Sequence, residues 1–362
     1  MLNLIVFIFG LNYHYYAHTM SAKSSIYEIT QLNMPGVRPD HNEQYLCKAI
    51  KLDRTNVHYI TKFQPQISMS RAHHMLLFGC DLPGSDEEHN KIIKARQYFR
   101  DCGEMTSQSN TASSSLPVCD PSGKTSIIYG WAKDAPALTL PAGTGFKVAG
   151  NTEVQYLVLQ VHYMHPLQGD VTLENYFKIK LNILEADFSG VTLTSTTTPM
   201  PNLAGVLLIA TDGMIKANSK ENFEAACLID EDVEIHPFAF RVHAHDRGIV
   251  VSGFKVHGDR WDLIGKKSPK EPQMFYPVNN TDMVIRKNDI VAARCTMENI
   301  EDRDIKIGAT GDDEMCNFYI MYFVQNGSIL KDNTCTSAGP PIYYWGRDGG
   351  LKNIPDKFAS TL

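Results

Sequence analysis

The chain has 362 residues, of which 43% are hydrophobic and 20% are charged, so it can form two domains that each bury a core. This composition excludes a disordered or fibrous protein. The formal net charge is −6, and lysine and arginine are spread along the chain without a basic patch, so we expect no nucleic-acid partner.

An apolar segment, residues 2–11 (LNLIVFIFGL), lies at the N-terminus. It has the length of a signal-peptide core and is too short to span a bilayer. We therefore expect residues 1–22 to be a signal peptide that directs the chain to the secretory pathway, in a granule lumen or outside the cell. No lysine or arginine precedes Lys23, so a buried N-terminal strand is the alternative. No later segment is apolar enough to predict a transmembrane anchor.

Cysteine usage supports the same compartment. The eight cysteines lie at positions 47, 80, 102, 119, 227, 295, 316 and 335, and none forms a C-x-x-C pair. The missing C-x-x-C pair disfavours a zinc knuckle or a thioredoxin-like site. An even number, four in each half of the chain, indicates disulfides within domains in an oxidising compartment, with their pairing left open. Two sequons, which begin at Asn279 and Asn326, could be glycosylated there.

Strand signals dominate the chain. Short runs rich in β-branched and aromatic residues, separated by Gly, Pro, Asn and Asp, occur at 156–162, 206–210, 249–256 and 318–324. They predict an all-β protein built of β-sandwich or jelly-roll domains. The best helical candidate is 86–99, and 106–117 is predicted to be a long loop. The proline-stiffened run 194–201 is the predicted linker between domains at 34–193 and 202–345.

Two histidine elements lie in the first of these predicted domains. His73 and His74 are adjacent, and adjacent side chains on a regular strand point to opposite faces, so both could bind one metal only at a bulge or turn. His162 shares a strand face with Gln160. Each element alone is more often unrelated to metal, but three imidazoles together suit copper or zinc.

The second predicted domain carries a sharper pattern. Strand alternation places Arg241, His243 and His245 on one face, where H-x-H is a compact metal clip and the arginine can hold a carboxylate. Alternation likewise aligns Met315, Asn317 and Tyr319. A thioether with two imidazoles suits copper that must be stable as Cu(I). Core packing is the simpler role for a lone methionine, but Asn and Tyr on the same face indicate a polar cavity.

These elements together resemble the peptidylglycine α-hydroxylating monooxygenase family, the hydroxylase half of peptide-amidating enzymes. The resemblance covers about residues 34–340, and the matching stretches are 34–37 (MPGV), 45–47 (YLC), 73–80 (HHMLLFGC), 156–163 (YLVLQVHY), 238–245 (FAFRVHAH), 275–278 (FYPV), 292–295 (AARC) and 313–322 (DEMCNFYIMY). It implies two jelly-roll β-sandwiches separated by a cleft, with one copper site per domain.

The resemblance also implies roles for the individual residues. An electron-storing copper would be held by His73, His74 and His162, and a catalytic copper by His243, His245 and Met315. Substrate contacts would come from Arg241, Asn317, Tyr319 and Gln160, with Arg241 on the terminal carboxylate of the peptide. Ascorbate would supply electrons and dioxygen the oxygen atom, so that the Cα of a C-terminal glycine is hydroxylated to a peptidyl-α-hydroxyglycine.

The chain departs from the family pattern at several points. Phe188 stands where the family often has a cysteine, and no cysteine precedes Cys47, so one further family disulfide is absent. Asp246 replaces a non-liganding histidine. The remaining pairing that the resemblance implies is Cys47–Cys102, Cys80–Cys119, Cys227–Cys335 and Cys295–Cys316. No lyase domain follows the hydroxylase sequence, so we expect a separate lyase to release the amide.

Two alternatives stay open at this point. A dopamine β-monooxygenase-like enzyme would share the copper chemistry but act on a catecholamine; its family carries an extra N-terminal domain, for which no space precedes Met34. A non-catalytic secreted β-sandwich could bind copper without turnover. Arg241 beside the H-x-H favours an anionic peptide end over the first alternative, and the two separate clusters disfavour the second.

Overall fold

A computed structural model describes residues 27–84, 100–102, 117–166, 187–308 and 310–362. The predicted signal peptide, the helical candidate 86–99 and most of the loop 106–117 lie outside the described residues. Within these ranges the chain is built almost entirely of β-strands, with one short helix, α3 (Asp356–Ala359), so the all-β prediction is confirmed. No described helix has the length and apolar character needed to cross a bilayer.

The first half of the chain, residues 27–196, packs two antiparallel sheets face to face. One contains, in spatial order, β1 (Tyr27–Asn33), β10 (Gly190–Thr196), β3 (Val57–Gln66) and β8 (Thr144–Ala149), with β7 (Leu138–Thr139) beside β3. The other contains β5 (Arg100–Asp101), β2 (Gln44–Lys51), β9 (Tyr156–Tyr163), β4 (His74–Cys80) and β6 (Thr125–Ala132). Between them, the rings of Phe63 and Tyr129 stack 4.7 Å apart.

The central strands β4 and β9 are buried along their whole length. One face of their sheet packs on β3 and β10, and the other face carries a second cluster that includes Tyr45, Phe78 and Val158. A strand that is covered on both faces needs a continuous apolar run rather than an alternating one. The sequences HMLLFGC and YLVLQVHY fit that requirement, with a histidine near the same end of the strand pair.

The second half, residues 202–362, has the same two-layer plan. One sheet contains β11 (Asn202–Thr211), β20 (Asn317–Gln325), β14 (His236–His243) and β17 (Tyr276–Pro277), with β21 (Thr334–Ser337) beside β11. The other contains β13 (Ser219–Leu228), β18 (Ile290–Asn299), β15 (Gly248–His257) and β16 (Arg260–Lys267). A separate ribbon pairs β12 (Met214–Ile215) with β19 (Ile305–Lys306). The stacked rings of Phe240 and Phe318 lie in this core.

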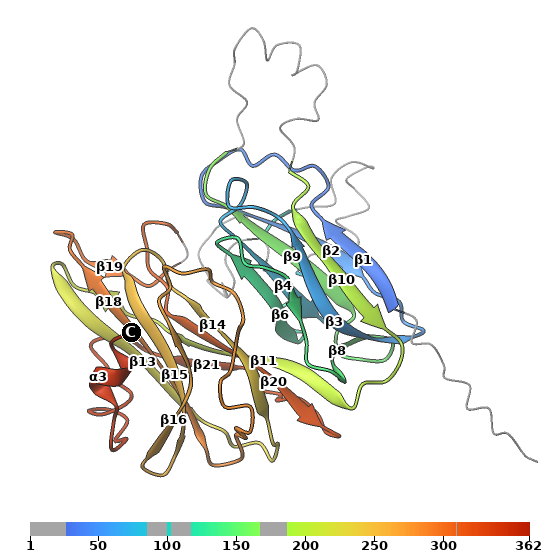
Figure 1. Cartoon of the computed structure of the whole chain (residues 1–362). Coiled ribbons are helices and arrows are strands. Elements are labelled where there is room, and N and C mark those ends of the chain that lie inside the picture. Colours follow the sequence, from blue (N-terminus) through green and yellow to red (C-terminus); the bar gives the residue numbers. More distant parts are fainter. Residues whose placement is uncertain (1–26, 85–99, 103–116, 167–186, 309) are drawn as a thin grey trace, which may run out of the picture.

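The two halves meet along a shared edge (Figure 1). Strands β8 and β11 pair in parallel through Thr144 and Gly145 opposite Asn202 and Leu203, so one sheet runs through both halves. The core of the first half also includes Phe275 of the second half. Strand β10 extends to Thr196, so 194–196, predicted as linker, are strand, and 197–201 connect the halves. The domain limits 34–193 and 202–345 stay predictions.

Four disulfides cross-link the described residues. They join Cys47 to Cys102, Cys80 to Cys119, Cys227 to Cys335 and Cys295 to Cys316, which is the pairing that the resemblance implies. Two lie in each half and none joins the halves. The Cys295–Cys316 bridge ties β18 to the residue just before β20, and so fixes the start of the strand that carries Asn317 and Tyr319.

Candidate metal centre

Three histidines converge at one end of the β4–β9 pair. His74 begins β4 and lies opposite His162 of β9, while His73 occupies the bend just before β4. The backbone N–H of His73 donates to the carbonyl of His162 at 2.9 Å, which holds the bend against β9. The turn that the adjacent histidines require is therefore present, and we call His73, His74 and His162 the first histidine group.

The Nδ1 atoms of this group form a nearly equilateral triangle. The edges are 3.3 Å from His73 to His162, 3.4 Å from His73 to His74, and 3.4 Å from His74 to His162. A neutral imidazole nitrogen either donates or accepts a hydrogen bond. Among three nitrogens at least two must have the same role, so hydrogen bonds cannot satisfy all three edges.

A metal ion at the centre would satisfy all three nitrogens. The centre of an equilateral triangle lies at a distance of the edge length divided by √3 from each corner. Here that distance is about 1.9 Å from each nitrogen, close to the ~2.0 Å usual for a metal–imidazole bond. Burial lowers the pKa of His73 to about 4 and that of His74 well below its usual value. Both imidazoles are therefore neutral near pH 7 and keep their lone pairs for a metal.

Two residues outside this triangle orient His162. Its Nε2 lies 2.8 Å from a carboxylate oxygen of Glu43, and Tyr45 stacks on its ring at 4.0 Å. Partial burial raises the pKa of Glu43, but hydrogen bonds from His162 and from the backbone of Gly311 turn the net shift downward. An ionised carboxylate only accepts, so Nε2 of His162 carries the proton and Nδ1 offers a lone pair. Such a carboxylate–histidine pair is typical of metal sites.

The second histidine group, His243 and His245, lies at the end of β14, with ring centroids 5.4 Å apart. Nδ1 of His245 donates to the backbone carbonyl of Asp313 at 3.0 Å, and its Nε2 is buried without a hydrogen-bond partner among the described residues. Nδ1 of His243 lies 2.5 Å from Oε1 of Gln273. Both rings therefore carry their proton on Nδ1 and leave the lone pair on Nε2 available to a metal.

Met315 lies just before β20 and is 8% exposed. Nδ2 of Asn317 contacts its sulfur at 3.9 Å, and its side chain belongs to a cluster with Tyr45, Leu76 and Phe78 of the first half. This packing is also what a core residue would make. The role of Met315 as a ligand therefore stays a prediction.

Arg241 is one of the most deeply buried charged residues, at 2% exposed. Its Nε donates to the backbone carbonyl of Gln273 at 2.9 Å, and its guanidinium lies 5.0 Å from the ring centroid of Tyr319. No carboxylate of the described residues lies within ion-pair distance of it. Burial lowers the pKa of Arg241 and raises that of Tyr319. A buried cation without a counter-ion is costly and is typical of a site for an anionic ligand.

The sheet register aligns the predicted substrate residues with the second histidine group. On β14 and β20, Arg241 lies opposite Tyr319 and His243 opposite Asn317. Nδ2 of Asn317 also contacts the hydroxyl of Tyr319 at 3.4 Å. Gln160 lies elsewhere: it precedes His162 by two residues on β9, and its amide contacts Sγ of Cys102 at 3.7 Å. The structure thus brings Arg241, Asn317 and Tyr319 together and places Gln160 against a disulfide.

The two histidine groups face each other at the junction of the halves. The ring centroids of His74 and His243 are 5.7 Å apart, and those of His73 and His245 are 6.0 Å apart. Five imidazoles from two halves therefore share one buried region. Sequence reasoning missed Glu43 and Gln273, although each lies two residues from a recognised motif, 45–47 or 275–278.

Comparison with known proteins agrees with this arrangement. Residues 30–170 match the family model for the N-terminal domain of copper type II ascorbate-dependent monooxygenases, and residues 202–348 match the model for their C-terminal domain. The chain belongs to the copper type II ascorbate-dependent monooxygenase family. The donor set of the first histidine group suits this metal, because imidazole is a favoured copper ligand.

Several named relatives align with nearly the whole chain. Peptidyl-glycine alpha-amidating monooxygenase A of Xenopus laevis is 38% identical over 340 residues, which cover 93% of this chain and 31% of that protein. The corresponding protein of Rattus norvegicus is 36% identical over 86% of this chain and 28% of its own length. Human dopamine beta-hydroxylase is 24% identical over 85% of this chain. The chain spans about a third of the length of the amidating relatives that it matches.

Proposed function

We propose that this chain hydroxylates the Cα of the C-terminal glycine in glycine-extended peptides. The observation that carries the proposal is Arg241, a buried guanidinium without a carboxylate partner among the described residues, two positions along β14 from His243. A free peptide C-terminus supplies the missing negative charge. Its carboxylate is bonded directly to the carbon that would react. A carboxylate bound to Arg241 would therefore place that carbon beside the second histidine group.

We propose that copper is held at two places. His73, His74 and His162 would hold one ion through Nδ1. The other ion would be held by Nε2 of His243 and His245 and by the sulfur of Met315. Copper so bound would supply one-electron redox chemistry, with ascorbate as reductant and dioxygen as co-substrate. One oxygen atom enters the C–H bond, and the other leaves as water with two electrons from ascorbate and two protons.

The surrounding residues would bind and orient the peptide. Arg241 forms a charge-assisted pair with the carboxylate, and Tyr319 can donate its hydroxyl proton to the same group. Asn317 presents an amide to the peptide backbone. Gln160 would line the space beside the first histidine group. The burial of these side chains keeps water away from the carboxylate and strengthens its pairing with Arg241.

The product, a peptidyl-α-hydroxyglycine, still has to be cleaved to give an amide. We propose that a separate lyase performs this step, and that both reactions take place in the secretory pathway, in a granule lumen or outside the cell. The four disulfides fit an oxidising compartment. The sequon asparagines Asn279 and Asn326 are both exposed, as a glycosylated residue must be.

The direct test is ascorbate-dependent oxygen consumption by the copper-loaded protein with three substrates. A glycine-extended peptide should be consumed with incorporation of one oxygen atom, which mass spectrometry detects. The same peptide ending in alanine tests the need for glycine, and a phenethylamine tests the dopamine-like alternative, to which the 24% identical relative points. Copper binding without turnover of any substrate would support the non-catalytic alternative and refute the proposal.

A further inference from the structure

The loop before β17 contains a glutamine that contacts both parts of the proposed catalytic site. Gln273 is 1% exposed. Its Oε1 lies 2.5 Å from Nδ1 of His243, and its Nε2 donates to the carbonyls of Ala244 and Pro269, each at 2.9 Å. Its own backbone carbonyl accepts from Nε of Arg241 at 2.9 Å. One residue therefore touches a proposed metal ligand and the proposed carboxylate anchor.

The orientation of the amide is fixed by its partners. Carbonyl oxygens only accept hydrogen bonds, so the two contacts with Ala244 and Pro269 require the NH₂ end of Gln273. The oxygen end is then left for His243, which must donate from Nδ1. This arrangement excludes the tautomer with the proton on Nε2, and so keeps the lone pair of His243 on the atom proposed to bind metal.

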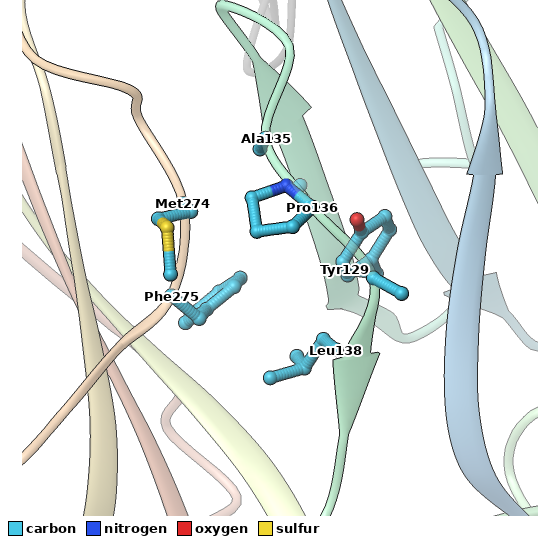
Figure 2. A pocket seen from close by; sticks show the side chains of 8 residues that line it. Tyr129, Ala135, Pro136, Leu138, Met274 and Phe275 are labelled. Atoms are coloured by element: carbon cyan, nitrogen blue, oxygen red, sulfur yellow. The ribbon is translucent and has the colours of Figure 1, made fainter.

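The loop that carries Gln273 is docked on the first half. Nζ of Lys133 donates to the carbonyl of Pro269 at 2.6 Å, so this oxygen is shared by a first-half lysine and Gln273. On the same loop, Met274 and Phe275 line one small pocket together with Tyr129 and Pro136 of the first half (Figure 2), and the rings of Phe275 and Tyr129 stack 6.5 Å apart. The position of this loop therefore depends on how the two halves pack together.

Close packing leaves little freedom on the other side of the loop. A Cβ at Gly248 would lie 2.6 Å from Cγ of Pro269 and 2.8 Å from Cβ of Ala244, closer than carbon atoms approach without displacement. Glycine at 248 therefore lets the loop pack directly on the residue between the two histidines. The two residues whose carbonyls accept from the amide of Gln273 are therefore closely packed against Gly248.

We propose that Gln273 is a positioning residue for the copper-dependent reaction. Its side chain sets the tautomer and orientation of His243, while its main chain holds Arg241, so that the metal ligand and the carboxylate anchor keep a fixed relation. The inference rests on the proposed function for the role of Arg241. The role of Gln273 in orienting His243 does not depend on that function, because it rests on the observed hydrogen bonds alone.

Two substitutions with a matched control test the proposal. Gln273→Leu removes the side-chain contacts and keeps the backbone carbonyl that binds Arg241. The control is Gln155→Leu: Nε2 of Gln155 also donates to two backbone carbonyls, those of Gly150 and Thr152, at 3.0 and 2.6 Å, but its side chain forms no hydrogen bond with a histidine of the described residues. Gln273→Glu keeps an oxygen that can accept from His243 and serves as the conservative variant.

The first readout is the apo-protein, which needs no copper and no substrate. Imidazole ¹⁵N resonances of the wild type and of Gln155→Leu should show His243 with its proton on Nδ1. Gln273→Leu should show a tautomer mixture, and Gln273→Glu should keep a proton on Nδ1 of His243, because a carboxylate oxygen can still accept from it. In the loaded protein, Gln273→Leu should lower copper affinity at the second histidine group by about 10- to 100-fold.

The kinetic readout separates positioning from general loosening. With copper saturating, Gln273→Leu should lower kcat, while KM for a glycine-extended peptide stays within about threefold, because the contact with Arg241 is made by the main chain. A wild-type tautomer and wild-type copper affinity in Gln273→Leu would overturn the proposal. A loss of substrate affinity as large as the loss of kcat, together with a lower melting temperature, would overturn it as well. That result would mean that the glutamine has only a structural role.

The same measurements distinguish this inference from the proposed function. If no peptide is oxidised by the wild type but Gln273→Leu shifts the tautomer of His243 and weakens copper binding, the proposed function fails and the positioning role stands. If peptides are oxidised and Gln273→Leu behaves as Gln155→Leu does, the function stands and the positioning role fails.

Discussion

Replacing Arg241 by glutamine should remove the carboxylate anchor without touching a metal ligand. Arg241 is 2% exposed, and the described neighbours of its guanidinium include the backbone carbonyl of Gln273, Gly130 and the aromatic side chains of Tyr319 and Tyr129. None of these neighbours carries a full negative charge at neutral pH. The substrate carboxylate would therefore be the main counter-ion, and its loss should appear almost entirely in substrate recognition.

The size of the effect follows from the burial of this pair. Truncating one partner of a buried, hydrogen-bonded charge pair costs about 2–5 kcal/mol. At about 1.36 kcal/mol for each factor of ten, Arg241→Gln should lower kcat/KM by roughly 30-fold to a few thousand-fold. A fully exposed arginine would give less than about 1 kcal/mol, so a loss below about fivefold would mean that Arg241 does not read the substrate.

The assay compares two changes that remove the same contact. Oxygen consumption is measured with a glycine-extended peptide and with the same peptide capped as a C-terminal amide, for the wild type and for Arg241→Gln. Capping should cost the wild type most of the free energy that the substitution costs, and should cost the variant little, because the partner is already missing. Equal losses from capping in both proteins would refute the reasoning, provided that both retain two copper ions.

A stability measurement separates the anchor from a structural arginine. Arg294 is also buried, but it pairs with Glu224 and Asp356. Arg294→Met would leave Glu224 buried without its partner and should cost about 3–5 kcal/mol of unfolding free energy. Arg241→Met removes an uncompensated cation, so the melting temperature of the apo-protein should stay the same or rise. A large fall for Arg241→Met would mean that its role is structural.

Three further outcomes are expected. Met315→Ile should abolish hydroxylation while the first histidine group still binds copper; normal turnover would make Met315 a core residue. Glu43→Ala should weaken copper binding at His162 and its partners by about 10- to 100-fold, measured by equilibrium dialysis against a copper chelator, and an unchanged affinity would contradict the carboxylate–histidine pair. Reduction of the four disulfides should lower the melting temperature, since each contributes about 2–4 kcal/mol; mass spectrometry finding a bridge between residues 47–119 and 227–335 would contradict the pairing within halves.

Strand periodicity predicted much of the fold and part of the site. The apolar runs at 156–162 and 318–324 form β9 and β20, because short runs rich in β-branched and aromatic residues are typical of strands that are buried in a sheet. The same rule aligned Arg241 with His243, and the bend at His73 followed from the geometry of two adjacent histidines. These predictions succeed because they depend on neighbours in sequence.

The residues that were missed depend on neighbours in space. Gln273 reaches His243 from a loop 30 residues further along the chain, and Glu43 reaches His162 across 119 residues. Neither has a local pattern that distinguishes it from an ordinary polar loop residue. Gln160 shows the converse limit: its face relative to His162 was predictable, but its contact with Cys102 depends on the disulfide from Cys102 to Cys47, which lies opposite Gln160 on β2.

The contacts that surround the histidines explain why the site depends on both halves at once. Each histidine group is supplied by one half, yet the residues that orient them reach across the junction. Glu43 orients His162 and accepts from the backbone of Gly311, while Lys133 shares a carbonyl with Gln273. A change in docking would therefore disturb the tautomers and orientations of the proposed ligands before it disturbed either sandwich. The rigid sheets hold the ligands, and the docked loops determine whether those ligands are ready to bind.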